Sequence, residues 1–272
     1  MKIVRTIAEL RPRIRAVPPA LTIGLVPTMG AFHGGHVALF RAARHECHHV
    51  VASLFVNPTQ FGDPRDLATY PRDEARDARI AEESGVDVLF APSAEEIFPA
   101  GYGTWVTVEG PAQGLEGDFR PGHFRGVATV CAKLFAIVAP QIAFFGQKDA
   151  QQVAVVRQMV RDLNLPLDIR VVPTVRDEDG LALSSRNVRL TGEDRQRALA
   201  IPRALSAGLA AYRSGADAVA AAEAALEGLT PDYVSIADFD GQPTLAIAAP
   251  VGAVRLIDNV RLTNDNRSEP QA

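Results

Sequence analysis

The sequence LTIGLVPTMGAFHGGH, residues 21–36, decides the predicted fold, because an apolar run (21–26) passes directly into a glycine-rich turn with two histidines. This order is typical of a β-strand that leads into the N-terminus of a helix. Unpaired backbone N–H groups and about half a positive charge gather at a helix N-terminus and bind phosphate groups there. His33 and His36 fall on one face of the first helical turn, so two imidazoles can donate to the same polyphosphate.

Two other roles of this histidine pair stay open at the level of sequence. Each histidine can be a solvated side chain or a helix cap, since an imidazole titrates near pH 6.5 and often only sits at a surface. The pair can also be half of a metal site. Structural zinc, however, takes four ligands, usually with cysteine, and no matching third and fourth ligand follows nearby.

The rest of the first 175 residues alternates between strand and helix patterns. Short apolar or β-branched runs at 21–26, 50–55, 87–90, 142–145 and 168–172 indicate strands, and helical patterns cover about 36–46, 73–84, 125–138 and 149–163. This order predicts an α/β fold, a Rossmann-like parallel sheet with helices on both faces. Ligands of such sheets bind outside the carboxyl ends of the strands. The unusual residues lie there, after Val26, Phe55 and Phe145.

The pattern changes near Pro173, so we expect a second, smaller domain. We predict a Rossmann-like domain over 1–175, a small C-terminal α+β lid domain over 176–262, and a flexible tail over 263–272. The second domain is expected to contain alanine-rich helical segments at 193–212 and 216–226 and strands at 232–236 and 251–257. The polar composition after residue 263 is typical of a frayed terminus.

Composition excludes several classes of protein. With 47% hydrophobic and 22% charged residues, 272 residues suffice for one large and one small globular domain, and the net charge of −4 gives no footprint for nucleic acid. Cys47 and Cys131 form neither a disulfide framework nor a CxxC motif, which indicates a cytoplasmic protein with reduced thiols. Charged residues interrupt the N-terminal segment, and Lys133, Pro140 and Gln141 interrupt the apolar run 127–145, so neither a secretory signal nor a membrane span is predicted.

A second motif, FVNPTQFG at 55–62, places two amide side chains where a strand ends in a proline turn. A neutral amide can donate to a carboxylate or hydroxyl without attacking it, so Gln60, together with Asn57, suits the orientation of a small polar acid. The alternative is an Asn-Pro turn followed by a surface glutamine.

A third motif, FFGQKDAQQ at 144–152, resembles another phosphate-facing strand end. Lys148 offers a compact positive charge, and Gln152 faces the same way one turn later. Asp149 can simply cap the helix.

A fourth motif, GLALSSRN at 180–187, lies where the second domain begins. Two hydroxyl groups and a guanidinium can donate to a polyphosphate, and a loop at a domain junction can close over a site. The same composition is also common in ordinary turns.

Together, and in this order and spacing, the four motifs closely resemble the pantoate–β-alanine ligase family over about residues 1–262. The first motif alone indicates only the wider nucleotidyltransferase superfamily related to class I aminoacyl-tRNA synthetases. There the paired histidines match the HIGH element, and GLALSSRN occupies the place of the KMSKS loop.

The resemblance implies that the chain forms pantoyl adenylate from ATP and pantoate, and then transfers the acyl group to β-alanine. It implies contacts with ATP by Pro27, Met29, Gly30, His33, His36, Gly146, Lys148, Asp149, Ser184, Ser185 and Arg186. The catalytic group within this set is His33, His36, Lys148, Ser184, Ser185 and Arg186, which would hold the phosphates as pyrophosphate leaves. The resemblance further implies that Asn57, Gln60, Gln152 and Met29 contact pantoate.

The resemblance also implies that a magnesium ion accompanies ATP, and Asp77 matches an acidic position near that ion. It further implies a homodimer. RPGHFRGV at 120–127 matches the family near the site and the subunit contact, where His123 and Arg125 can be structural. Gly34 departs from the family, which often has a larger residue between the histidines. It loosens the helix start by up to about 1 kcal/mol.

Two competing functions remain. One is a nucleotidyltransferase of the same superfamily that transfers AMP to a phosphorylated acceptor, such as a nicotinamide mononucleotide adenylyltransferase, but an anionic acceptor calls for lysine or arginine where this chain has Gln60 and Gln152. The other is a non-catalytic nucleotide-binding module, against which the retained phosphate-facing residues argue.

Overall fold

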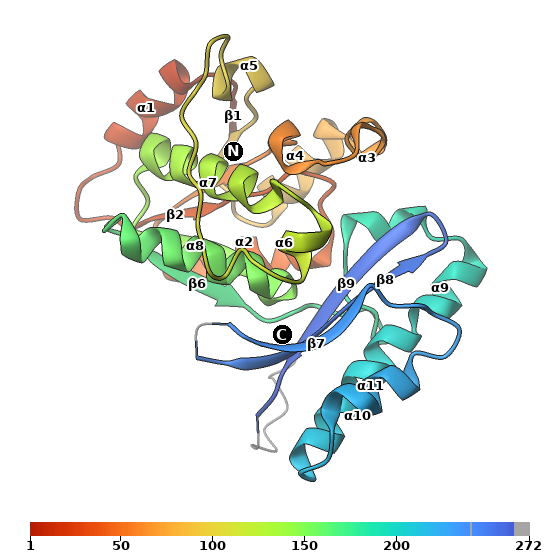
Figure 1. Ribbon diagram of the computed structural model, residues 1–272. Coiled ribbons are helices and arrows are strands. Elements are labelled where there is room, and N and C mark those ends of the chain that lie inside the picture. The colour runs from red at the N-terminus through yellow and green to blue at the C-terminus, as the bar shows by residue number, and fades with distance from the viewer. Residues whose placement is uncertain (240, 264–272) are drawn as a thin grey trace. The chain divides into compact units, whose positions relative to one another are not determined.

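The computed structural model describes residues 1–239 and 241–263 (Figure 1). The chain divides into two compact units, of which the first combines Met1–Gly146 with Gln151–Val172, and the second combines Gln147–Ala150 with the chain from Pro173 onward. The predicted domain limits, 1–175 and 176–262, stay a prediction. They differ from these units chiefly in Gln147–Ala150, the segment that carries Lys148. The predicted tail lies, apart from Thr263, outside the described residues.

The first unit is built on a parallel sheet of six strands in the order β1-β4-β3-β2-β5-β6. The strands are β1 (Lys2–Val4), β2 (Ile23–Val26), β3 (His49–Ser53), β4 (Val88–Phe90), β5 (Ile142–Gly146) and β6 (Asp168–Val172). All five strand pairings are parallel, which confirms the predicted α/β class. Strand β1 is not predicted from the sequence, because its three residues are too few to show a period.

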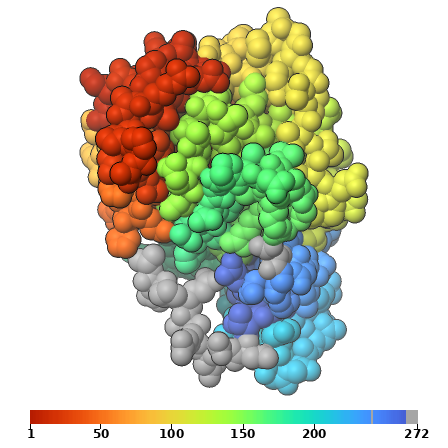
Figure 2. Space-filling model, turned by 90° about the vertical axis from the view of Figure 1, so that its left-hand side faces the viewer, coloured from red at the N-terminus to blue at the C-terminus, as the bar shows by residue number. Residues whose placement is uncertain are grey.

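Helices connect these strands. They are α1 (Ile7–Arg15), α2 (Gly34–Glu46), α3 (Pro64–Thr69), α4 (Glu74–Glu83), α5 (Ala94–Ile97), α6 (Glu116–Phe119), α7 (His123–Val138) and α8 (Ala150–Asp162), with 3-10 turns η1 (Pro58–Gln60) and η2 (Gln147–Asp149). Figure 2 shows α1 in red beside α7 in yellow-green and α8 in green, on one surface of the unit. Among the described residues, no helix is long and apolar enough to cross a membrane.

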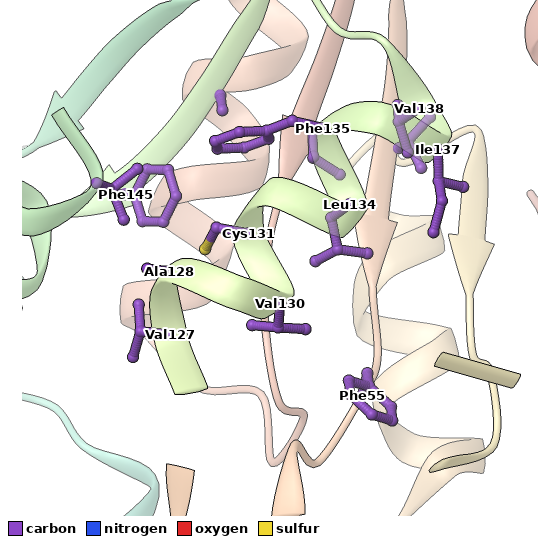
Figure 3. Packing of buried hydrophobic residues seen from close by; sticks show 14 of the residues in the cluster. Phe55, Val127, Ala128, Val130, Cys131, Leu134, Phe135, Ile137, Val138 and Phe145 are labelled. Atoms are coloured by element: carbon purple, nitrogen blue, oxygen red, sulfur yellow. The ribbon is translucent and has the colours of Figure 1, made fainter. Parts of the chain in front are cut away.

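Each face of the sheet has its own apolar core. Successive side chains of a strand point to opposite faces, and Leu25 accordingly joins the core under α7 and α8 while Val26 joins the core that contains Phe40 of α2. Figure 3 shows α7 in the first of these cores, together with Phe55 and Phe145. Full burial of one such large side chain contributes about 1.5–3 kcal/mol. Because all six strands are parallel, their carboxyl ends lie at the same edge of this sheet.

Helix α7 is apolar on nearly all sides, as expected of a helix buried in a core. It ends at Ala139 in the left-handed conformation (φ 48°), and Pro140 follows. Burial raises the pKa of the Cys131 thiol to about 12 and that of Cys47 to about 11. Both thiols are thus held in their unreactive protonated form.

The second unit contains an antiparallel sheet with helices against it (Figure 1). Its elements are η3 (Ser185–Arg189), α9 (Gly192–Ala198), α10 (Ala200–Arg213), α11 (Ala218–Ala225), β7 (Tyr233–Asp238), β8 (Pro243–Val251) and β9 (Val254–Arg261). Leu205 of α10 and Ala222 of α11 pack against Leu245 and Ile247 of β8. Strand β9 pairs with β8, which places Asp258 opposite Ile247.

The predicted strand over 251–257 is confirmed only in part, because 254–257 lie in β9 and Val251 ends β8, while residues 252 and 253 form the turn between these two strands. Gly252 takes a positive φ of 57° there, and β9 begins only at Val254. Strand β8 went unrecognised, since alanine has a low strand propensity and its run of consecutive buried residues has no period of two. Only pairing with two neighbours identifies this segment as a strand.

Candidate active site

In the first unit, the turn after β2 is tied to the end of β3. The backbone N–H of Thr28 donates to Ser53 Oγ at 3.0 Å, the Thr28 hydroxyl donates to the Ser53 carbonyl, and the N–H of Phe55 donates to the Thr28 carbonyl at 3.1 Å. Thr28 and Ser53 are both buried, so these bonds replace those lost to water. The turns after β2 and β3, which carry the first two motifs, are therefore held side by side.

The turn then passes through two residues with positive φ, Gly30 at 94° and Ala31 at 54°. Asp77 of α4 stabilises this conformation. Its Oδ2 accepts from the N–H of Ala31 at 2.7 Å and its Oδ1 accepts from the N–H of Phe32 at 2.8 Å. Only 1% of Asp77 is exposed. Gly30 suits this turn, because L side chains rarely adopt a φ of 94° and a Cβ there would also lie 2.6 Å from Leu54 Cδ1.

His33 and His36 are joined in a capping box at the start of α2. The N–H of Gly35 donates to His33 Nδ1 at 3.1 Å, and the N–H of His33 donates to His36 Nδ1 at 3.3 Å. Since a backbone N–H can only donate, both Nδ1 atoms are acceptors, and each neutral ring carries its hydrogen on Nε2. The ring centroids lie 4.2 Å apart. The capping role that the sequence left open is thus realised, and it orients two Nε2–H donors.

The glycines between the histidines have different surroundings. Gly34 is the exposed first residue of α2, and the capping box holds the helix start in spite of it. A Cβ at Gly35 would approach His33 Cε1 to 2.9 Å. A side chain at Gly35 would therefore displace the His33 ring.

Asn57 and Gln60 are buried in the turn that follows β3. Asn57 Nδ2 donates to the Gly126 carbonyl at 3.2 Å and to Gln60 Oε1 at 2.8 Å, while its Oδ1 accepts from Thr59. A carbonyl only accepts, so the amide of Asn57 has one possible orientation, and it makes Gln60 Oε1 an acceptor. Gln60 consequently presents its Nε2 group as a neutral donor, whereas both hydrogens of Asn57 Nδ2 are used inside the protein. The predicted contact between Asn57 and pantoate stays a prediction.

Residues at the start of α7 and just before it form hydrogen bonds with the backbone carbonyl of Gln60. His123 Nδ1 lies 2.9 Å from the Gln60 carbonyl and must be the donor, which leaves its Nε2 to accept from Arg120 Nη1 at 3.2 Å. Arg125 instead stacks over Trp105, with its guanidinium carbon 4.4 Å from the ring centroid. These contacts of His123 and Arg125 are thus with the protein itself, as a structural role requires.

The remaining predicted contacts of this unit, Pro27, Met29, Gly146 and Gln152, are half-buried at the ends of β2 and β5 and at the start of α8. Beside Gln152, Gln151 is buried. Its Nε2 lies 3.1 Å from the carbonyls of Pro111 and Gly114, and its Oε1 accepts from the N–H of Glu116 at 3.0 Å. Gln151 thereby anchors the start of α8.

The second unit carries the other predicted phosphate contacts. Lys148 Nζ lies 3.2 Å from Asp149 Oδ1, and the Lys148 side chain is 20% exposed. In the loop 180–187, Ser184 is the N-cap of η3 and accepts from the N–H of Arg186 at 3.3 Å, with Ser185 and Arg186 half-buried. Lys148 and this loop are parts of one compact unit.

Comparison with known proteins identifies the family, since a family model described as Pantoate-beta-alanine ligase matches residues 2–261. The chain belongs to the pantoate–β-alanine ligase family. Among ligases of this family, pantothenate synthetases from Moorella thermoacetica and Chloroflexus aggregans are 50% and 51% identical to it; the matches cover 96% and 95% of this chain and 99% of each relative. It is therefore an enzyme of the predicted class.

Solved ligase structures agree. The pantothenate synthetase from Thermus thermophilus superposes with a TM-score of 0.91 at 48% identity, over 96% of this chain and 99% of that one. The pantoate-beta-alanine ligase from Francisella tularensis, complexed with beta-gamma ATP and beta-alanine, gives 0.86 at 36% identity, over 96% and 98%. These matches confirm the predicted family and fold.

Gly126 tests how far Gln60 depends on α7. A Cβ there would lie 2.4 Å from the Thr59 carbonyl oxygen, a backbone atom that cannot move aside. We expect Gly126→Ala to displace η1 and lower the free energy of unfolding by about 1–3 kcal/mol. In the matched control Gly192→Ala nothing lies within 4 Å of the new Cβ, and the change should stay within about 1 kcal/mol. Urea unfolding measures both, and equal effects would contradict the close packing of α7 on η1.

Proposed function

We propose that this ligase condenses (R)-pantoate with β-alanine, in the pathway to pantothenate, at the expense of ATP, which becomes AMP and pyrophosphate. The observation that carries the proposal is the orientation of Gln60, whose neutral Nε2 donor follows β3 in the same unit as the Nε2–H groups of His33 and His36. The Francisella tularensis complex, which holds an ATP compound and β-alanine, supports both as substrates.

In the first step a carboxylate oxygen of pantoate attacks the α-phosphorus, the bond from that phosphorus to the bridging oxygen breaks, and pyrophosphate leaves. The product is pantoyl adenylate. This step needs no protein nucleophile, and the enzyme contributes position and charge. Alignment of the carboxylate is worth about 7–11 kcal/mol, and oriented donors on the leaving phosphates add several more.

The residues divide this work. His33 and His36 donate to the phosphates through Nε2, with Pro27, Met29 and Gly30 lining the same turn. Lys148 and Arg186 neutralise the charge that moves to pyrophosphate, and the hydroxyl groups of Ser184 and Ser185 donate to it, while Gly146 and Asp149 are assigned to the adenosine ribose.

Gln60, Gln152 and Met29 orient pantoate, with Asn57 behind Gln60. Neutral amides favour a carboxylic acid with hydroxyl groups over a phosphorylated acceptor, which calls for lysine or arginine. In the second step the free amine of β-alanine attacks the acyl carbon, the bond from that carbon to the AMP oxygen breaks, and AMP leaves. The amide product is pantothenate.

Magnesium would accompany ATP, but the described residues do not form a separate metal-binding site for it. Residues 1–239 and 241–263 contain no cluster of three or more histidine, cysteine or acidic side chains that could hold a metal ion. Both carboxylate oxygens of Asp77 already accept from the Ala31 and Phe32 N–H groups. Mg²⁺ commonly keeps several waters and binds substrate phosphates, which fits this chain better than a protein site at Asp77.

A homodimer and a cytoplasmic location complete the proposal. The half-exposed Trp105 under Arg125 is a large aromatic surface of the kind that interfaces favour, and the buried free thiols of Cys47 and Cys131 fit a reducing compartment. Light scattering tests the dimer directly.

The proposed reaction is tested with purified protein, ATP, Mg²⁺, pantoate and β-alanine. AMP release should require both organic substrates, and pantothenate should form in equal amount. Pyrophosphate should exchange into ATP with pantoate alone, because the first step is reversible. Release of pyrophosphate with nicotinamide mononucleotide instead of pantoate, with AMP joined to that acceptor as a dinucleotide and not released, would identify the rival adenylyltransferase.

Gln60→Glu tests the neutral donor. Glutamate keeps an oxygen for Asn57 Nδ2 but replaces the Nε2 donor with an anionic oxygen, which would repel the carboxylate of pantoate. We expect the KM for pantoate to rise by about 100-fold or more, with the KM for ATP nearly unchanged. Steady-state kinetics with each substrate varied in turn measures the two constants, and equal rises in both would count against the assignment.

The substitution Asp77→Asn distinguishes two possible roles of Asp77, that of a magnesium ligand and that of a residue that stabilises the turn. The variant removes one of two acceptors for the Ala31 and Phe32 N–H groups, so kcat/KM for ATP should fall by about 10–100-fold. The Mg²⁺ concentration that gives half-maximal rate should stay within about twofold if Asp77 does not bind the metal. A tenfold rise in that concentration would return Asp77 to the role of magnesium ligand.

A further inference from the structure

Strand β9 carries two buried polar residues in succession, Asp258 and Asn259, of which 4% and 6% are exposed. Asparagine is disfavoured in strands, and a buried amide or carboxylate is costly without partners. Neither residue belongs to a predicted motif. Because successive side chains of a strand point to opposite faces, these two reach two different segments of the unit.

Asn259 holds the backbone of the third motif. Its Nδ2 donates to the Lys148 carbonyl at 2.8 Å and to the Gln147 carbonyl at 3.1 Å, and its Oδ1 accepts from Gln147 Nε2 at 3.3 Å. Two residues further on the same face, Arg261 Nη2 donates to Gln147 Oε1 at 2.7 Å. The amide of Asn259 is fully used, and its orientation is set because carbonyls only accept.

Asp258 holds the base of the fourth motif. Its carboxylate makes a forked pair with Arg176, with Nη1 to Oδ2 at 2.6 Å and Nη2 to Oδ1 at 3.1 Å. Arg176 Nη1 also donates to the carbonyl of Gly180, the first residue of the loop, at 3.2 Å. Arg176 further forms a β-bridge with Ala182. A paired and forked guanidinium of this kind fixes geometry as well as charge.

We propose that Asn259 is a positioning residue for the adenylation step. It joins Lys148 through β9 to the loop 180–187, so that both sets of phosphate-binding groups move as one body. The path runs from the Lys148 carbonyl to Asn259, to Asp258 through the Asn259 N–H at 2.8 Å, and then to Arg176 and Gly180. The assignment of phosphates to these groups rests on the proposed function. The physical link does not.

The link is tested by hydrogen exchange on the whole protein. Asn259→Asp keeps the size of the side chain but sets an oxygen against the Gln147 and Lys148 carbonyls, so amide exchange in 147–150 should quicken by about tenfold or more. The control Val260→Ala removes apolar contacts from the next residue of β9, which has no bond in this path. Unchanged exchange in 147–150 in Asn259→Asp, or an equal increase in the control, would overturn the proposal whatever the activity of the protein.

The catalytic consequence is tested by a double-mutant cycle with Lys148→Ala. Displacement of Lys148 should make Asn259→Asp lower kcat for pyrophosphate exchange by about 10–100-fold. If the effect passes through Lys148, the same change in the Lys148→Ala background should cost less than about threefold. Additive losses would show that Asn259 acts only through general stability. If the unmodified protein shows no exchange of pyrophosphate into ATP, the proposed function is overturned. The amide hydrogen-exchange test of the link remains valid in that case.

Discussion

The buried carboxylate of Asp77 is the interaction on which the first half of the site depends. It accepts from two successive N–H groups in a turn where Ala31 has a positive φ, a conformation that a residue with a side chain seldom adopts. Loss of a partner for each buried N–H costs about 1–3 kcal/mol. The capping box of His33 and His36 begins directly after this turn, so the orientation of both imidazoles follows from it.

A common principle sets the donors of the site. A backbone N–H can only donate and a backbone carbonyl can only accept. A backbone N–H that donates to Nδ1 therefore makes each imidazole a donor at Nε2. The Gly126 carbonyl likewise orients the amide of Asn57, which in turn makes Gln60 a donor at its own Nε2. Each group is thus oriented before any substrate binds. Such preorganisation is a main source of catalytic power, because no reorganisation is needed when charge moves.

The second unit shows the same principle on a larger scale. Asp258 and Asn259 are adjacent in sequence but act on segments far away in the chain, at Gly180 and Lys148. A strand is a stiff support for such contacts, since β9 is paired along its length with β8. The compact unit therefore includes Gln147–Ala150, although these residues follow β5 of the other unit directly in the chain.

The sequence by itself determined the parallel α/β class, five of the six strands of the parallel sheet, the family and the residues of four motifs, because these features are local: periodicity, strand ends and motif spacing all lie within short windows. Tertiary structure decided the rest. That Asp77 supports the turn, and that the Gly126 carbonyl orients Asn57 and through it Gln60, depend on hydrogen bonds between segments distant in the chain. That β8 is a strand depends on its pairing with both β7 and β9. No window of sequence contains both partners of the Asp77, Gly126 or Asn259 bonds, and this is why only the fold could reveal them.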